Sequence, residues 1–310
     1  MASDARTRRD LARLLTRVSR ASIPELLALD GGMANDGGWT IAVTGPAGVG
    51  KSTLIASLAR MRLDRLKREA PDGAENLLAV LAIDPSSPLS GGAILGDRIR
   101  MDAVAGDPAI YVRSIASAGA YGGLSRSIVN LLSVAQDHGF PEVLVETVGA
   151  GQSEYTAADL ADTVLLVLQP ETGDVVQAMK SGIMEIADIY VVNKAHLPGA
   201  ARTVAEVNAM LEYVTPAGRV WHPPVIAVTD PDNLSAVDAA IEAQRAAMGP
   251  ETLQARRARR ERLWLTSMLT RRIEEIADGI EPGASRRARY RQVLEVLGKD
   301  LAVLDGGGTS

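Results

Sequence analysis

The sequence predicts an α/β protein: a doubly wound, mainly parallel sheet of the P-loop NTPase class, with helical extensions at both ends. Three observations carry this prediction. A glycine-rich loop lies between an apolar run and an amphipathic stretch, short runs rich in Val, Ile and Leu recur along the chain, and helix-like stretches separate most of them. Near-continuous apolar runs that alternate with helices are typical of parallel strands buried on both faces.

The apolar runs define the expected strands. They are Ile41–Val43, Leu77–Ile83, Ile110–Val112, Val143–Val145, Val164–Leu168, Ile189–Val192 and Val225–Val228. Sheets of this kind bind ligands outside the carboxyl ends of their strands. Polar residues or glycine follow most runs, at Gly45, Asp84, Glu146, Pro170 to Asp174 and Asn193-Lys194. One edge of the sheet is therefore predicted to carry the chemistry.

The glycine-rich loop reads GPAGVGKST and predicts nucleoside triphosphate binding. Gly45 and Gly50 let the backbone turn so that its N–H groups point at phosphate oxygens, Lys51 reaches the β/γ oxygens, and Ser52 is a ligand for Mg²⁺. The predicted nucleotide-binding residues of the loop are Gly45, Pro46, Ala47, Gly48, Val49, Gly50, Lys51, Ser52 and Thr53.

The amino-acid composition excludes several classes of function. The chain has 310 residues, 46% of them hydrophobic, and a net charge of −5, which argues against nucleic acid as the main partner. It has no cysteine, so neither a disulfide framework nor a thiolate zinc site is expected. The start lacks the apolar core of a signal peptide, and no apolar run reaches membrane-spanning length. We expect a soluble cytoplasmic protein with no membrane partner.

The chain divides into three predicted parts. Residues 1–38 form an N-terminal helical arm, 39–248 the P-loop domain, and 249–310 a C-terminal helical extension that is a candidate dimerisation region. The extension begins with an arginine-rich helix, and its arginines (Arg256, Arg257, Arg259, Arg260 and Arg262) are expected to form a solvated face rather than a site for an anionic partner. The apolar stripe beside them needs a covering surface, either the core or another subunit.

Carboxylates at the sheet edge are candidates for the metal site. Glu146 directly follows a buried run, in the usual place of the second element of a P-loop magnesium site. Asp84 also ends a run and is a candidate for the metal shell, with turn or helix-cap chemistry in Asp-Pro-Ser-Ser as the alternative. Asp97 follows a glycine-rich stretch that could order around a metal, and by itself is a weak signal.

Two further segments are candidate switches. Gly149 and Gly151 allow the backbone to approach and sense a γ-phosphate, with a plain glycine loop as the alternative. Asp174 and Lys180 lie across another strand-to-helix junction, where the residues alone favour a helix cap and a surface lysine.

Asn193-Lys194 is similar to the guanine-reading element NKxD, in which the asparagine and lysine frame the base and the aspartate accepts hydrogen bonds from two guanine N–H groups. Here the fourth position is His196. A neutral imidazole offers one acceptor rather than two, so the motif does not decide whether the bound nucleotide is GTP or ATP.

Four segments together resemble one family. They are the phosphate loop, AVLAIDPSSPLSGGAILGDRIRM, VLVETVGAGQSE, and GDVVQAMKSGIMEIADIYVVNK. These closely resemble the MeaB/ArgK-type G-protein chaperones of adenosylcobalamin-dependent acyl-CoA mutases, and the likeness covers most of residues 39 to 230.

The resemblance implies a slow, partner-stimulated GTPase of the dimer-forming SIMIBI-type branch, which binds Mg²⁺ and GTP or GDP. It would gate adenosylcobalamin loading and protect or reactivate the mutase. Ser52, Asp84, Asp97 and Glu146 are then the implied metal shell, and Lys51, Asp84, Glu146 and Lys180 the implied catalytic residues. The implied switch residues are Asp97, Gly149, Gly151, Gln152, Asp174 and Lys180, so the resemblance overrides the local reading of Asp174 and Lys180.

The sequence differs from the family pattern at two places, and both are expected to contact the nucleotide base. His196 replaces the aspartate, and Thr229-Asp230-Pro231 stands where the family has its later base-contacting loop. Asp230 is a candidate substitute acceptor, and we expect a divergent chaperone that serves a mutase other than the methylmalonyl enzyme. There are two alternatives. One is an NTPase, using either GTP or ATP, that acts as a maturation factor for another metalloenzyme. The other is a kinase of the ArgK type. The chain lacks the His- or Cys-rich tracts of metal carriers and any element committed to positioning an acceptor hydroxyl.

Overall fold

The computed structural model describes residues 11–18, 38–71, 74, 76–85, 106–117, 127–147, 157–170, 183–214, 220–280, 283 and 285–306. Seven parallel strands form one sheet in the order β3-β2-β4-β1-β5-β6-β7. The strands are β1 (Trp39–Thr44), β2 (Leu78–Pro85), β3 (Ile110–Ser117), β4 (Glu142–Glu146), β5 (Thr163–Leu168), β6 (Ile189–Val192) and β7 (Val225–Ala227). Each predicted run is a strand, and the sheet is parallel throughout.

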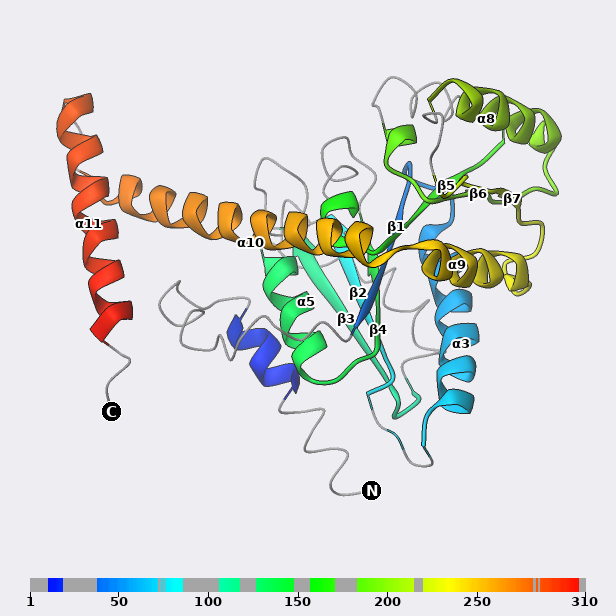
Figure 1. The fold of residues 1–310 in the computed structure, drawn as a ribbon, viewed down its shortest axis with the longest axis horizontal. Helices are drawn as coiled ribbons and strands as arrows, with labels where there is room; N and C mark the ends of the chain where they lie inside the picture. The colour runs from blue at the N-terminus through cyan, green and yellow to red at the C-terminus, as the bar shows by residue number, and fades with distance from the viewer. Residues whose placement is uncertain are drawn as a thin grey trace.

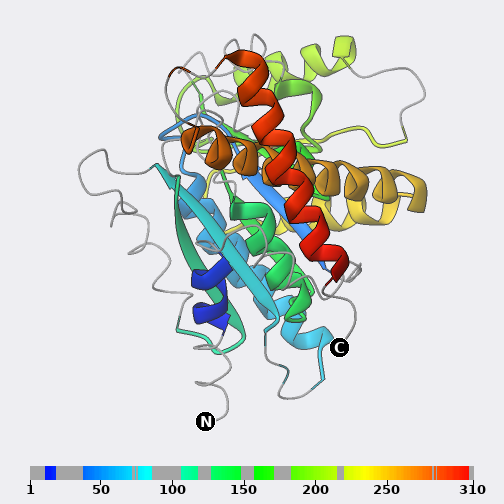
Figure 2. The same ribbon diagram turned by 90° about the vertical axis from the view of Figure 1, so that its left-hand side faces the viewer.

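Helices cover both faces of the sheet, as the doubly wound prediction requires (Figures 1 and 2). On one face α3 (Lys51–Glu69) and α9 (Ser235–Ala247) pack into a core with the inward side chains of β1, β5 and β6. On the other face α5 (Ser127–Asp137) and the helix at 11–18 pack against β2 and β4. The apolar runs are continuous because strand residues on both faces are buried, as in β1 and β5.

The far end of the sheet has its own small core. Beside β6 and β7 lie α8 (Ala200–Val214) and the single 3₁₀ turn Ile183–Glu185. Leu166 and Tyr190 of the sheet pack there against Val207 and Leu211 of α8. This packing holds the carboxyl end of β6 in place, and the predicted base-reading residues Asn193 and Lys194 follow directly after it.

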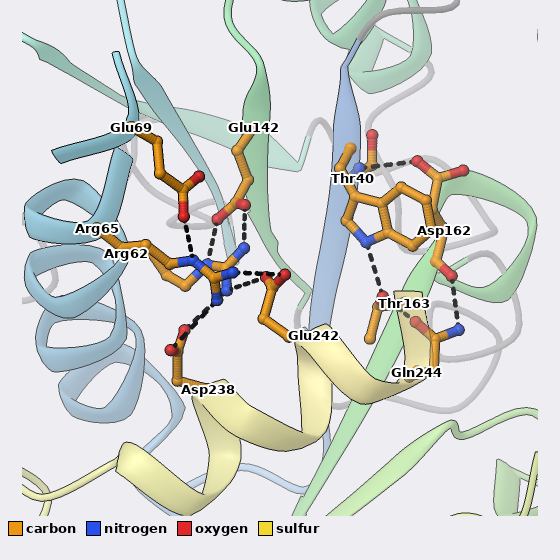
Figure 3. Close-up of polar contacts among 11 residues, drawn as sticks. Thr40, Arg62, Arg65, Glu69, Glu142, Asp162, Thr163, Asp238, Glu242 and Gln244 are labelled. Carbon is orange, nitrogen blue, oxygen red and sulfur yellow. Dashed lines mark hydrogen bonds and ion pairs between the residues drawn. The ribbon is translucent and has the colours of Figure 1, made fainter. Parts of the chain in front are cut away.

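At the amino ends of the strands, a buried arginine joins three elements (Figure 3). Arg62 of α3 is 1% exposed and forms a two-point ion pair with Glu142 of β4, with its Nε 2.7 Å from Oε1. Its Nη1 also donates to Asp238 and Glu242 of α9, over 2.7 Å each. Burial lowers the pKa of Arg62, but the hydrogen bonds and charge of these carboxylates outweigh it and raise the pKa. The network fastens α3 and α9 to the sheet.

The C-terminal extension begins with α10 (Pro250–Asp278), which is fastened at the amino ends of β5 and β6. Arg256 donates to both carboxylate oxygens of Asp188 over 2.7 Å each, and Arg260 donates to Asp162 Oδ1 over 2.9 Å. Both aspartates also accept backbone N–H groups of the sheet, from Val164 and Thr40. The predicted solvated face is therefore wrong for Arg256 and Arg260, because each neutralises a buried carboxylate. It is correct for Arg259 and Arg262, which are exposed.

Beyond this anchor, α10 crosses α5 and extends away from the sheet to α11 (Arg286–Gly306) at its far end (Figure 1). Met268 is buried against the core around α5, whereas Leu265, Leu269 and Ile273 lie one turn apart on a face that is 42–50% exposed. Arg272 joins the two helices by donating to both oxygens of Asp300. Among the described helices, none is both long and apolar enough to cross a membrane.

Candidate functional site

The phosphate loop follows β1 at the centre of the sheet, between β4 and β5. Gly45 has a φ of 140°, and a Cβ there would lie 2.1 Å from the carbonyl oxygen of Val167 in β5. Gly50 has a φ of 94°, and a Cβ there would lie 2.7 Å from Asn193 Nδ2. Only glycine fits either position, so the loop can pack closely against the end of β5 and against Asn193, which follows β6.

Lys51 and Ser52 begin α3, and both are 8% exposed. Lys51 Nζ donates to the carbonyl oxygens of Gly45 and Pro46, over 2.8 Å each, which holds the ammonium group across the loop. The first turn of α3 contains no acidic residue. The positive end of the helix and the lysine charge therefore act together on an anion bound in the loop.

The loop is joined to the next strand by a hydroxyl and a carboxylate. Ser52 Oγ donates to Glu146 Oε1 over 2.7 Å. Glu146 ends β4, is 6% exposed, and lies level with Val43 of β1. A serine hydroxyl beside a buried carboxylate supplies two of the oxygen ligands that Mg²⁺ prefers.

Ser52 and Glu146 fit a magnesium ion that also binds phosphate oxygens. Within the described ranges, no group of three or more acidic or histidine side chains is placed to hold a metal. Mg²⁺ in phosphate-transfer sites is commonly bound by one or two protein ligands, phosphate oxygens and water. Ser52 and Glu146 match that requirement.

Several predicted site residues lie outside what the structure describes. Asp84 lies near the end of β2, where its backbone pairs with Ala116 of β3, two residues beyond Ala82, which pairs with Glu146; its side chain is not described. The remaining candidates, which lie outside the described residues, are Asp97, Gly149, Gly151, Gln152, Asp174 and Lys180.

The residues that directly follow β5 and β6 contact the outer side of the phosphate loop. Asn193 Nδ2 donates to the carbonyl oxygen of Val49 over 2.8 Å. Lys194 has a φ of 54°, and its Nζ donates over 2.8 Å to both the Gly48 carbonyl oxygen and Gln169 Oε1. The structure therefore brings the predicted loop residues and Asn193-Lys194 together.

His196 is exposed and lies beside the loop that follows β7. Its Nδ1 is 3.3 Å from the carbonyl oxygen of Thr229. A carbonyl oxygen only accepts, so this contact requires the proton on Nδ1 and leaves Nε2 as the acceptor. Asp230 Oδ1 already accepts the N–H of Asp232 over 2.9 Å, within its own turn.

Comparison with models of protein families shows the family to which this chain is related. The model of the methylmalonyl-CoA mutase-associated GTPase MeaB matches residues 16–281. The chain belongs to the MeaB family. The resemblance predicted from the four sequence segments is thus confirmed, as is the P-loop α/β fold.

Individual relatives agree. A protein of Pyrococcus abyssi, provisionally named as a GTPase, is 42% identical over 228 residues, which are 71% of this chain and 66% of that protein. The mouse mitochondrial protein named as a homologue of methylmalonic aciduria type A is 32% identical over 241 residues, which are 76% of this chain and 56% of that one. The chain therefore spans between about half and two thirds of the length of these MeaB relatives.

A solved structure supports the fold alone. The crystal structure of a LAO/AO transport system kinase superposes with a TM-score of 0.55 and 20% identity, over 93% of this chain and 97% of that one. At this identity the likeness extends to the arrangement of elements and not to the reaction.

One residue that contacts the candidate site, Gln169, was not predicted from the sequence. Gln169 directly follows β5, and the sequence reading of that strand end considered only Pro170 to Asp174. The available signal was its position, since it is a polar residue immediately after a fully buried strand at the edge that carries the site.

Proposed function

We propose that this chain is a magnesium-dependent GTPase that acts as a chaperone for an adenosylcobalamin-dependent acyl-CoA mutase. The observation that carries the proposal is the joined pair Ser52 and Glu146 beside Lys51, in a chain of the MeaB family. The kinase and metalloenzyme-maturation alternatives have no comparable support.

Each residue of the loop has a distinct task in this proposal. The ammonium group of Lys51 leaves the Gly45 and Pro46 carbonyls and turns to the β/γ-phosphate oxygens, where its charge offsets theirs. Ser52 and Glu146 would hold Mg²⁺, which would supply positive charge beside the phosphates. By resemblance, Asp84 and Asp97 complete the metal shell, and Lys180 joins Lys51, Asp84 and Glu146 as a catalytic residue.

Base recognition uses Asn193, Lys194 and His196. Nε2 of His196 presents a single acceptor, whereas guanine offers two adjacent N–H donors to the aspartate that it replaces. We propose that GTP is bound with weaker discrimination against ATP than an aspartate would give. This follows because an unmatched donor at a binding site lowers affinity by about 1–3 kcal/mol.

The proposed partner follows from the family's association with methylmalonyl-CoA mutase. Residues around Gly149, Gly151 and Gln152, and the segment from Asp174 to Lys180, would change conformation with the γ-phosphate and respond to the mutase. Hydrolysis would then time the loading of intact adenosylcobalamin and the release of damaged cofactor.

The experiment is a hydrolysis assay with and without the candidate partner. We would measure phosphate release from GTP and ATP with Mg²⁺, alone and with each acyl-CoA mutase of the source organism, using Lys51→Ala as the inactive control. The expected result is slow GTP turnover that one mutase accelerates. If no mutase binds or changes the rate, the chaperone role is wrong. If Lys51→Ala hydrolyses GTP as fast as the unaltered protein, the site is wrong.

We also propose a homodimer through the C-terminal extension. The exposed face formed by Leu265, Leu269 and Ile273 supports it, because such a stripe gains stability when a second surface covers it. Light scattering after size exclusion should give twice the chain mass, and Leu269→Glu should give the monomer. A monomer for the unaltered protein, with and without nucleotide, would refute the dimer. The cytoplasmic location stays a prediction, and the mouse relative is named as mitochondrial.

A further inference from the structure

The side chain of Gln169 lies where the phosphate loop, β5 and β6 meet. Its Oε1 accepts a hydrogen bond of 2.8 Å from Lys194 Nζ, and the same ammonium group donates to the carbonyl oxygen of Gly48. Lys194 therefore connects the end of β5 to the outer side of the loop.

Backbone register makes this contact possible. Leu168 and Val192 are paired between β5 and β6, so Gln169 and Asn193 are the residues at which these neighbouring strands leave the sheet. The N–H of Asn193 donates to the carbonyl oxygen of Leu168 over 2.8 Å, which extends the pairing by one bond. Lys194 then turns with its positive φ of 54°, and its ammonium group reaches both acceptors.

We propose that Gln169 is a positioning residue of the nucleotide site, which fixes Lys194 so that the aliphatic stem of the lysine forms a preset surface for the purine base. This inference rests on the proposed function, because it assumes that a nucleotide occupies the loop. Gln169 itself does not touch the base or the phosphates.

The chemistry of a glutamine suits this task. A free lysine side chain loses considerable rotamer freedom when a ligand immobilises it, and a stem already held by two acceptors loses less. An amide oxygen holds the ammonium group without placing a negative charge beside the phosphate loop, where a carboxylate would repel the nucleotide. Gln169 therefore favours base binding without opposing phosphate binding.

The test separates the base from the phosphates. Calorimetric titrations with Mg²⁺ would measure the affinity of GDP and of inorganic pyrophosphate for the full chain and for Gln169→Leu, Gln169→Glu and Gln136→Leu. Gln136 is a matched control, because its Nε2 donates to Thr40 Oγ1 at the amino end of β1, away from the loop.

We expect Gln169→Leu to bind GDP about tenfold more weakly and pyrophosphate within about twofold of the unaltered protein, since one hydrogen bond to a charged group is lost. Gln169→Glu keeps the acceptor, so it should weaken both ligands by a similar factor and preserve their ratio. Gln136→Leu should change neither affinity.

Two results overturn the inference alone. They are a Gln169→Leu variant that binds GDP as tightly as the unaltered protein, and one that loses GDP and pyrophosphate equally, which would indicate general damage to the loop. An unaltered protein that binds neither GDP nor pyrophosphate would instead refute the proposed function, and this inference with it.

Discussion

Ser52 and Glu146 are 94 positions apart in the chain, and the hydroxyl of one donates to the carboxylate of the other over 2.7 Å. Ser52 comes from the first turn of α3 and Glu146 from the last residue of β4, and both are almost fully buried. The contact therefore joins the phosphate loop to the neighbouring strand at the point where a nucleotide-bound metal would lie.

Removing either partner should weaken magnesium-dependent nucleotide binding. We expect Ser52→Ala and Glu146→Gln to lower the affinity for GDP with Mg²⁺ at least about tenfold, and to have a smaller effect in EDTA, because the loop itself remains. Ser57→Ala is the control: it removes a hydroxyl on the same helix that contacts Asp232 instead. Equal affinities for Ser52→Ala and Ser57→Ala would show that Ser52 does not contribute to a metal site.

Two glycines of the phosphate loop should respond differently to alanine. At Gly45 a Cβ would meet the backbone oxygen of Val167 at 2.1 Å, whereas at Gly48 it would meet nothing within 4 Å. We expect Gly45→Ala to cost about 3 kcal/mol or more of folding stability, and Gly48→Ala about 1–2 kcal/mol from its φ of 81° alone. Urea denaturation of both variants measures this difference, and equal losses would contradict it.

An aspartate at position 196 should increase guanine selectivity. His196→Asp supplies a second acceptor for the two guanine N–H donors, so the ratio of GDP to ADP affinity should rise about 10- to 100-fold in calorimetric titrations. His222→Asp introduces the same charge before β7, at the opposite end of the strand from the base-side loop, and should leave the ratio unchanged. An unchanged ratio in His196→Asp would mean that another group reads the base.

The anchor of α10 should matter more for stability than its exposed arginines. Arg256→Met leaves the carboxylate of Asp188, which is 1% exposed, without its bidentate partner, and we expect a loss of about 3–5 kcal/mol in the free energy of unfolding. Arg259→Met alters an exposed residue of the same helix and should change stability by less than about 0.5 kcal/mol. Similar denaturation midpoints would refute the structural role of Arg256.

Stability should depend on pH through Asp159. Burial raises the pKa of Asp159, and the charges of Arg259 and Arg262 offset this only partly. An acid with a raised pKa in the folded state favours folding when protonated, so its contribution is lost as pH rises through that pKa. Asp159→Asn should therefore be more stable than the unaltered protein at pH 7, by about 0.5 kcal/mol or less for this half-exposed group, and equal to it below about pH 4.

Denaturant titrations at several pH values measure this effect. Asp64→Asn makes the same change on an exposed acid of α3 and is the control. A gain for Asp159→Asn that is the same at pH 4 and pH 7 would indicate a cause other than ionisation.

Sequence reasoning was most successful where the signal is local. All seven apolar runs became strands, and those of the central strands such as β1 and β5 are continuous because a strand buried on both faces needs apolar side chains at most positions. The phosphate loop was readable because its glycines, lysine and serine must occur at fixed spacing for the backbone to surround a phosphate. The residues at the ends of β4 and β6 could be assigned to the candidate site by the general rule that parallel sheets bind ligands at their carboxyl edge.

Reasoning from the sequence was less successful for charged residues on helices. The arginines of α10 share one composition, yet Arg256 and Arg260 hold buried aspartates while Arg259 and Arg262 are exposed. Likewise, no local pattern links Arg62 to Glu142 or selects Gln169 from the polar residues after β5. Each of these contacts depends on which distant element packs alongside.

The parallel sheet, the phosphate loop and the family could thus be predicted from the amino-acid sequence, since they follow from the order and spacing of neighbouring residues. The partners of the polar side chains became known from the folded chain: Glu146 for Ser52, Gln169 for Lys194, and Asp188 for Arg256. The physical reason is that hydrogen bonds and ion pairs act over a few ångströms, and only packing brings residues far apart in the chain within that distance.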